Sequence, residues 1–315
     1  MLSEILSAGF LISLLAGMIR LATPILLPAL GQLYTQRAGI LNLGVEGTML
    51  MGAICAFATT CATNNNLWLG LLAGMVSGML YSLLMAWLSV TMRANQVIAG
   101  IGMNILATGL AAYIYRVIFG IRALPAKVET FQAVNIPGLA DIPFVGPVFF
   151  QHNILVYFAF IMVPVTWFIL ERTTFGLKIK SVGEHPRAAD SKGINVLGIR
   201  YAATLIGGAY AGIGGAFMTI AYLNTFTENV IGGFGYIAVS VVVFARFMPG
   251  RAMWGSLLFG LTSALQLRLQ AQGIGIPSQL LLMLPYFMTI VALIFASKNA
   301  EFPSAYTIPY SRMER

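Results

Sequence analysis

Long stretches of apolar residues without charge recur along the chain, and they have the pattern of membrane-spanning helices. A helix needs about 20 residues to cross roughly 30 Å of hydrocarbon, and nine stretches come close to this length, counting a first one interrupted by Arg20. We therefore predict an all-α polytopic integral membrane protein with about nine transmembrane helices, in a range of eight to ten that includes a short or re-entrant piece at 36–47. The stretches cover residues 7–30, two crossings within 47–92, and then 96–115, 153–170, 201–227, 229–245, 252–267 and 277–297.

Composition supports the same class of protein. Of 315 residues, 58% are hydrophobic and only 9% are charged, with a mean hydropathy of +0.85. Soluble domains carry about 25% charged residues, so a water-soluble globular enzyme is excluded. The connection at 120–152 is too short for a soluble domain, and we treat residues 1–315 as a single transmembrane domain. The net charge of +8 comes without a basic run interleaved with aromatics, so we expect no nucleic-acid partner.

The basic residues predict which side of the membrane each connection occupies. Short positively charged loops are retained in the cytoplasm. Of the 18 lysines and arginines, 13 gather on one side, in the 171–200 loop, the C-terminal tail and the connections at Arg37, Arg93, Arg246 and Arg251, against four on the other. We therefore predict that the 171–200 loop and the C-terminus are cytoplasmic, and that the N-terminus and the 120–152 connection are external.

Two polar, glycine-rich interruptions break the apolar pattern, one in each half of the chain. The first, at 37–52, contains Asn42 and Glu46 between glycines, and the second, at 231–250, has a glycine–aromatic cluster before an apolar run. Non-helical backbone and ionisable groups at membrane depth are tolerated only where they face a cavity or protein. Both segments predict broken helices, and their matching positions suggest an internal repeat. For Glu46, a place beside a translocation path and a packing or helix-end role are equally open.

Polar and aromatic residues near these breaks are the candidates for lining a path. Amide and aromatic side chains suit a neutral hydroxylated or heteroaromatic solute, which exchanges hydrogen bonds and stacks, better than they suit a phosphate or a metal ion. A nucleoside is therefore favoured over a simple sugar. The candidates are Asn42, Glu46, Asn95, Gln96, Asn104, Phe234 and Tyr236.

The 171–200 loop has internal structure of its own. It holds a third of the chain's lysines and arginines. Pro186 opens and Gly193 follows a short charged segment, which is the pattern of a helix with proline in its first turn and glycine just past its end. The small residues Ala188 and Ala189 between charges favour a helix that docks on a partner. The alternative is a solvated positive-inside loop.

Three segments together carry a family resemblance: 42–47 (NLGVEG), 176–196 (GLKIKSVGEHPRAADSKGINV) and 233–250 (GFGYIAVSVVVFARFMPG). They resemble the permease subunits of bacterial ABC importers of the ribose/branched-chain amino acid permease superfamily, and most closely the shorter permease of nucleoside (simple-sugar-type) uptake systems. The sequence FARF at 244–247 departs from the glycine-containing sequence that the family has before the proline.

This resemblance implies a role for the 176–196 segment and a set of partners. In that family the segment is the coupling loop that docks on the ATPase. The implied partners are a cytoplasmic ATP-binding subunit, a second, paralogous permease and an extracytoplasmic substrate-binding lipoprotein, in addition to membrane lipid. The implied location is the bacterial cytoplasmic membrane. The residues that match the coupling loop here are Gly176, Gly183, Glu184, Pro186, Arg187, Ala188, Ala189 and Gly193.

The chain has no ATP-binding sequence of its own. No G-x-x-x-x-G-K-[ST] motif occurs, and Cys55 and Cys61 lack histidine or carboxylate neighbours at metal-ligand spacing. We expect no bound cofactor, no metal and no enzymatic activity, with ATP used by a partner subunit. The predicted function is the permease of an ATP-driven nucleoside importer. The alternatives are an ABC permease for a simple sugar such as ribose, and an ion-coupled secondary transporter that uses Glu46 and Arg20.

Overall fold

Helices make up most of the structure, a computed structural model that describes residues 8–120, 126–135, 137–272, 277–297 and 302–311. The long helices are α2 (Ala8–Arg37), α3 (Val45–Ala62), α4 (Leu67–Ala86), α5 (Gln96–Phe119), α7 (Ile154–Arg172), α10 (Val196–Phe217) and α12 (Pro249–Ala271). The shorter ones are α6 (Val145–Phe149), α8 (Thr174–Glu184), α9 (Pro186–Ser191), α11 (Phe234–Phe244), α13 (Ser278–Leu282) and α14 (Leu284–Ser297). Single π-helical turns, Trp87–Thr91 and Met218–Tyr222, extend α4 and α10.

Asparagine side chains begin four of the long helices. Asn66, Asn95, Asn153 and Asn195 accept hydrogen bonds from backbone N–H groups in the first turns of α4, α5, α7 and α10. A side-chain oxygen at this position satisfies a donor that has no partner within the helix. The polar residues between apolar stretches therefore determine where these helices start.

Helix α10 is the centre of the bundle and packs on α2, α3 and α4. Glycines allow this approach: a Cβ on Gly52 of α3 would lie 2.5 Å from the carbonyl oxygen of Gly212 in α10, and a Cβ on Gly212 would overlap the carbonyl oxygen of Gly74 in α4. Membrane helices associate largely through such close backbone packing. The glycines of α3, α4 and α10 thus form packing surfaces.

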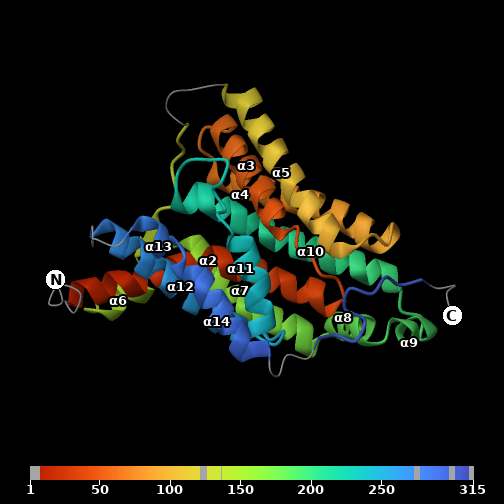
Figure 1. The fold of residues 1–315 in the computed structure, drawn as a ribbon. Helices are drawn as coiled ribbons and strands as arrows, with labels where there is room; N and C mark the ends of the chain where they lie inside the picture. Colours follow the sequence, from red (N-terminus) through yellow and green to blue (C-terminus); the bar gives the residue numbers. More distant parts are fainter. Residues whose placement is uncertain (1–7, 121–125, 136, 273–276, 298–301, 312–315) are drawn as a thin grey trace.

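The two ends of the bundle carry different elements (Figure 1). Helices α8 and α9 lie at one end beside the C-terminal tail, whereas α6, α13 and the start of α2 lie at the other. We call the first of these the α8–α9 end. The 120–152 connection contains the short helix α6. It also contains an antiparallel strand pair that the sequence did not reveal, β1 (Ala133–Asn135) with β2 (Gln151–Asn153), the second of which leads directly into α7.

Six of the described helices are long and apolar enough to cross a membrane: α2, α3, α4, α5, α7 and α10. The polytopic all-α class is confirmed, but the count of about nine spans is not. Helix α14 has only 14 residues, and α12, with 23, is not among the six.

The expected crossing at 229–245 is wrong as a full span. Helix α11 has 11 residues, which is about 17 Å of helix and roughly half the hydrocarbon thickness. Gly232 and Gly233 precede it with φ of +59° and +90°, a left-handed conformation that stops a right-handed helix from extending backwards. Hydropathy alone does not detect this break, because the glycines lie within an uncharged stretch.

The glycine contact between α4 and α10 predicts a stability difference. Gly212→Ala places a methyl group against the backbone of Gly74, and we expect it to destabilise the protein by about 1–3 kcal/mol through overpacking. Gly102→Ala in α5, where nothing lies within 4 Å of the added carbon, should be neutral or stabilise by about 0.5–1 kcal/mol. Thermal unfolding of the detergent-purified variants measures both, and equal melting temperatures would contradict the packing.

Candidate functional site

The carboxylate of Glu46 joins the two broken segments. It lies in the first turn of α3, and its two oxygens accept hydrogen bonds from the backbone N–H groups of Gly233 and Gly235, each at 2.7 Å. These donors begin the half-length helix α11, whose N-cap residue has no side chain to satisfy them. A negative group is stabilised at a helix N-terminus by the unpaired N–H groups and the helix dipole. Glu46 is therefore the N-terminal cap of a helix 187 residues further along the chain.

Asn104 of α5 completes the junction from a third helix. Its side-chain oxygen accepts from the N–H of Gly47 at 2.8 Å, and its nitrogen donates to the carbonyl of Leu43 at 2.9 Å and to the hydroxyl of Tyr236 at 2.7 Å. One amide thus binds the non-helical backbone before α3 and the first turn of α11 together.

The non-helical backbone between α2 and α3 is satisfied by two further amides. The oxygen of Gln96 accepts from the N–H of Leu41 at 2.8 Å, and the oxygen of Asn42 accepts from the N–H of Gly44 at 2.9 Å. Both side chains are buried, with exposed fractions of 3% and 1%. Irregular backbone in an apolar environment is expected to have its donors satisfied in this way.

The structure brings most of the predicted path residues together. The junction consists of Asn42, Glu46, Gln96, Asn104 and Tyr236, with the half-buried Phe234 beside it in α11. Asn95 is not part of it, because its exposed side chain caps α5 by accepting from the N–H groups of the next turn.

Sequence reasoning missed the backbone groups and one tyrosine. The N–H groups that Glu46 binds belong to glycines, which show no chemistry in a sequence, and the Tyr286 hydroxyl donates to the Gly232 carbonyl at 2.9 Å from α14. The only signal for this contact in the sequence was the pair of glycines, Gly232 and Gly233, before an apolar run. A tyrosine in an apolar helix gives no comparable signal, because it also occurs at membrane interfaces.

The junction offers hydrogen bonding and stacking rather than charge. Both Glu46 oxygens are held by backbone donors, whereas the Tyr236 ring is 44% exposed with its hydroxyl fixed by Asn104. Among the described residues, no group of three or more His, Cys, Asp or Glu side chains could hold a metal ion. The arrangement therefore suits a neutral, planar solute.

The predicted docking segment forms two consecutive helices at the α8–α9 end. Gly183 of α8 packs so tightly that a Cβ would overlap the carbonyl of Arg37, and Gly176 packs in the same way against the end of α7. As the sequence predicts, Pro186 occupies the first turn of α9, and Gly193 follows its end with φ of +81°. Arg187 completes the set and is exposed on α9.

The two alanines of α9 face opposite directions. Ala188 is exposed, whereas Ala189 is only 5% exposed and packs with Val182, Val196 and Tyr310 of its own chain. A side chain already buried in this way has little surface to offer a partner. Of the two small residues expected at a docking interface, only Ala188 is available.

The C-terminal tail joins α8 to the non-helical segment between α2 and α3. The Ala305 N–H donates to the carbonyl of Gly183, and the Thr307 N–H donates to the carbonyl of Gly39, each at 2.9 Å. Glu184 accepts from the N–H and the hydroxyl of Ser304 at 3.1 and 2.9 Å. Burial also raises the pKa of the Tyr306 phenol. The tail therefore ties the docking helices to the segment that leads into Glu46.

Comparisons with known proteins extend over nearly the whole chain. Residues 14–293 match the family model described as branched-chain amino acid transport system / permease component. The chain is 37% identical over 305 residues to a guanosine ABC transporter permease protein of Bacillus subtilis, covering 93% of this chain and 95% of the relative. It is also 37% identical over 331 residues to a putative glucose ABC transporter permease protein of Haloferax volcanii, covering 96% and 99%.

A third relative, a nucleoside ABC transporter permease protein of Lactococcus lactis, is 35% identical over 305 residues, covering 94% of this chain and 96% of the relative. Bacillus subtilis also has a second guanosine ABC transporter permease protein that matches, at 26% identity over 293 residues. The matches thus include two different permease proteins from one organism.

Changing Glu46 tests the cap at the junction. Glu46→Leu leaves the Gly233 and Gly235 donors without an acceptor, and each unsatisfied buried group costs about 1–3 kcal/mol. Glu46→Gln retains one acceptor and turns an NH₂ group toward the other donor, so we expect an intermediate loss. The control Glu228→Gln removes a carboxylate that is 59% exposed and paired with Arg116, which should change stability by less than about 1 kcal/mol. The free energy of unfolding in detergent ranks the three, and a Glu46→Leu variant as stable as the control would contradict the cap.

Proposed function

Because the chain belongs to the family of branched-chain amino acid transport system permease components, we propose that it is the membrane-spanning permease of an ATP-driven nucleoside importer. The observation that carries this proposal is the 37% identity to a guanosine permease along 93% of the chain. As a permease, the chain conducts a solute and is not an enzyme. ATP is hydrolysed on a separate subunit, and this chain binds no cofactor.

The junction supports a nucleoside as the solute. An exposed aromatic ring whose hydroxyl is fixed by an amide provides a stacking surface beside hydrogen-bonding groups. Nucleobases stack on aromatic side chains with about 1–3 kcal/mol per base, and a neutral nucleoside needs no counter-charge. Uptake of radiolabelled guanosine, with and without this chain in the assembled transporter, is the direct test.

A simple sugar is the second candidate, because the Haloferax relative carries the name of a glucose permease. The ion-coupled alternative has less support. A proton carrier needs a carboxylate that is free to change its protonation state, whereas both oxygens of Glu46 cap a helix. Glu46 therefore has a structural role beside the path.

We place the α8–α9 end in the cytoplasm, as the distribution of lysine and arginine predicts. This orientation puts the C-terminal tail and α9 where an ATP-binding subunit docks. A second, paralogous permease is supported by the two guanosine permeases of Bacillus subtilis that match this chain. A substrate-binding lipoprotein would deliver the solute to the opposite end, which carries α6 and the strand pair.

Removing the Tyr236 ring tests the stacking surface. We expect Tyr236→Ala to raise the KM for guanosine uptake by about 5-fold to 100-fold, because a stacked base loses about 1–3 kcal/mol. Tyr113→Ala is the matched control, since Tyr113 is 66% exposed on α5 and lies about 13 Å along the helix from Asn104. Competition with unlabelled glucose completes the experiment. Uptake that is blocked by glucose and insensitive to Tyr236→Ala would favour the sugar and contradict the nucleoside path.

Enlarging Ala188 tests the docking helix. We expect Ala188→Trp to abolish uptake while the permease still inserts, because overpacking a small-residue contact costs about 1–3 kcal/mol. Ala189→Trp would not be diagnostic, because that residue is buried within its own chain. The control Ala62→Trp enlarges an exposed alanine at the opposite end of the bundle. This variant should still bind the ATP-binding subunit. The measurements are co-purification of the ATP-binding subunit and uptake. If Ala188→Trp co-purified with as much ATP-binding subunit as the wild type and showed normal uptake, docking at α9 would be contradicted.

A further inference from the structure

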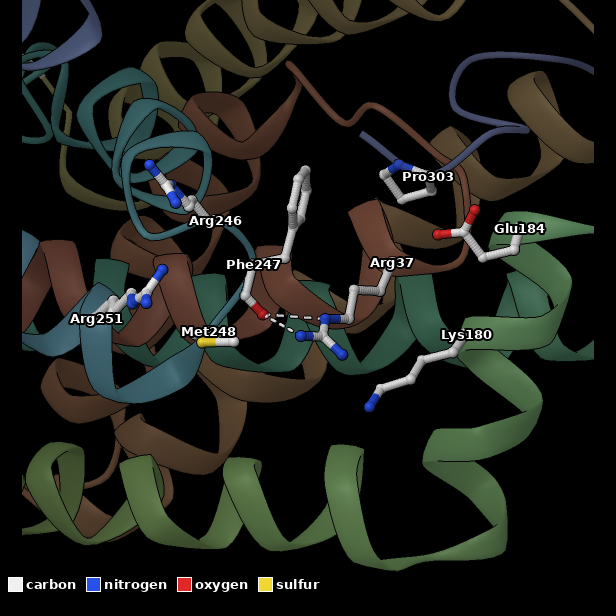
Figure 2. Close-up of a pocket in the computed structure, with 8 residues that line it drawn as sticks. All are labelled: Arg37, Lys180, Glu184, Arg246, Phe247, Met248, Arg251 and Pro303. Carbon is white, nitrogen blue, oxygen red and sulfur yellow. Dashed lines mark hydrogen bonds between the residues drawn. The ribbon is translucent and has the colours of Figure 1, made fainter. Parts of the chain in front are cut away.

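A basic cavity opens at the α8–α9 end, apart from the junction. It has a volume of about 670 Å³ and lies between the end of α2, helix α8, the turn from α11 to α12 and the C-terminal tail. Figure 2 shows Arg246 and Arg251 on one side of it and Lys180 and Glu184 on the other, with Arg37 between them. The cations are Arg37, Lys180, Arg246 and Arg251.

Half of this positive charge is compensated within the chain. Arg37 and Lys180 share the carboxylate of Glu171, with N···O distances of 3.0 and 2.5 Å. Glu184 accepts hydrogen bonds from Ser304 of the tail. In the part of the chain that the structure describes, Arg246 and Arg251 have no ion pair, and both are exposed. The cavity therefore presents two guanidinium groups to an anion from outside the chain.

The turn between α11 and α12 lies at the same cavity. Arg37 donates two hydrogen bonds to the Phe247 carbonyl, at 3.0 and 2.7 Å, and so holds the turn in which Arg246 and Phe247 have φ of +49° and +58°. Helix α12 starts at Pro249 directly after this turn, and its N-terminus has no side-chain cap. Unpaired N–H groups and the dipole of a long helix attract an anion to that end.

Tryptophans on α12 and α7, outside the lining of the cavity, indicate where the hydrocarbon boundary lies. Trp254, one turn along α12 from Arg251, is 68% exposed, and on the neighbouring helix α7 the guanidinium of Arg172 lies 5.5 Å from the Trp167 ring centre. Exposed tryptophans next to arginines are typical of the boundary between hydrocarbon and water. A phosphate that reaches the two free arginines here is most readily supplied by a phospholipid.

We propose that this cavity binds the phosphate of an anionic phospholipid headgroup, contacted by Arg246, Arg251 and the first turn of α12. With the proposed orientation, the lipid belongs to the cytoplasmic leaflet, where basic pockets between helices recognise anionic headgroups. Lys180 and Glu184 of α8 line the opposite side of the same cavity. The cavity therefore connects the proposed lipid site to the helix that leads into the docking segment.

The test measures lipid retained by the assembled transporter purified from membranes. Native mass spectrometry after titration with phosphatidylglycerol or phosphatidylcholine reports the lipid bound to the wild type and to Arg246→Gln/Arg251→Gln. We expect phosphatidylglycerol to bind preferentially, and the double variant to bind it at least about tenfold more weakly, because each nearby cation contributes about a fivefold factor. Rising salt should weaken phosphatidylglycerol binding by the wild type until it approaches that of the variant.

The control Lys178→Gln/Lys192→Gln removes two cations from the same end of the molecule, neither of which lines this cavity. It should retain wild-type lipid binding, and equal losses in both double variants would show a general charge effect and overturn the site. Unchanged phosphatidylglycerol binding in Arg246→Gln/Arg251→Gln would overturn it as well.

Two further arms separate the other sources of an anion. If inorganic phosphate at millimolar concentration binds wild type but not the variant, while phosphatidylglycerol is not enriched, the ligand is a soluble phosphate and the lipid assignment fails. If the variant keeps its lipid but loses the ATP-binding subunit, the arginines bind a protein carboxylate and the proposal is again overturned. Neither result depends on which solute is transported, so the nucleoside assignment stands or falls separately.

Discussion

The junction depends on one charged contact, the Glu46 carboxylate that accepts the N–H groups of Gly233 and Gly235. A half-length helix beginning inside an apolar bundle has donors that neither water nor its own side chains satisfy. A carboxylate is well suited to this position, because it accepts two bonds at once and complements the helix dipole. Without it, α11 would have to extend into the left-handed glycines or leave its donors unpaired.

Short connections link the Glu46 contact to the α8–α9 end of the molecule. The segment from Gly39 to Gly44 leads directly into α3, and the tail binds Gly39 at one point and Gly183 of α8 at another. Gly183 in turn packs on the carbonyl of Arg37, whose guanidinium holds the turn at the far end of α11. A displacement of α8 therefore acts on both segments that Glu46 joins. These contacts are close backbone packing and hydrogen bonds, so a movement of one segment displaces the next.

The sequence predicted the breaks and their chemistry better than it predicted helix lengths. Glu46, Asn104 and Tyr236 were all singled out, since polar groups in apolar stretches must be satisfied by something. The contact between Glu46 and the start of α11 could not be predicted, because its donors are backbone N–H groups, which nearly every residue has. Asn95 lies apart from the junction and caps α5, and an asparagine next to an apolar run is equally suited to lining a path and to capping a helix. The burial of Ala189 depended on the tail, whose irregular sequence has no period from which its position can be predicted.

Charge and substrate contact are separated along the axis of the bundle, and this separation fits the proposed mechanism. At the junction both oxygens of Glu46 are held by backbone N–H groups, so the proposed neutral solute would meet rings and amides without competing with an ion pair. At the α8–α9 end Arg246 and Arg251, which form no ion pair among the described residues, and the exposed face of α9 lie within reach of water, lipid and protein. A solute without charge has no electrostatic means of driving its own accumulation, so the work of transport has to enter from elsewhere. The tail and the hydrogen bonds from Arg37 to Phe247 connect that end to both segments of the junction, so in the proposed importer α8 and α9 would be the point at which a partner's movement opens or closes the path.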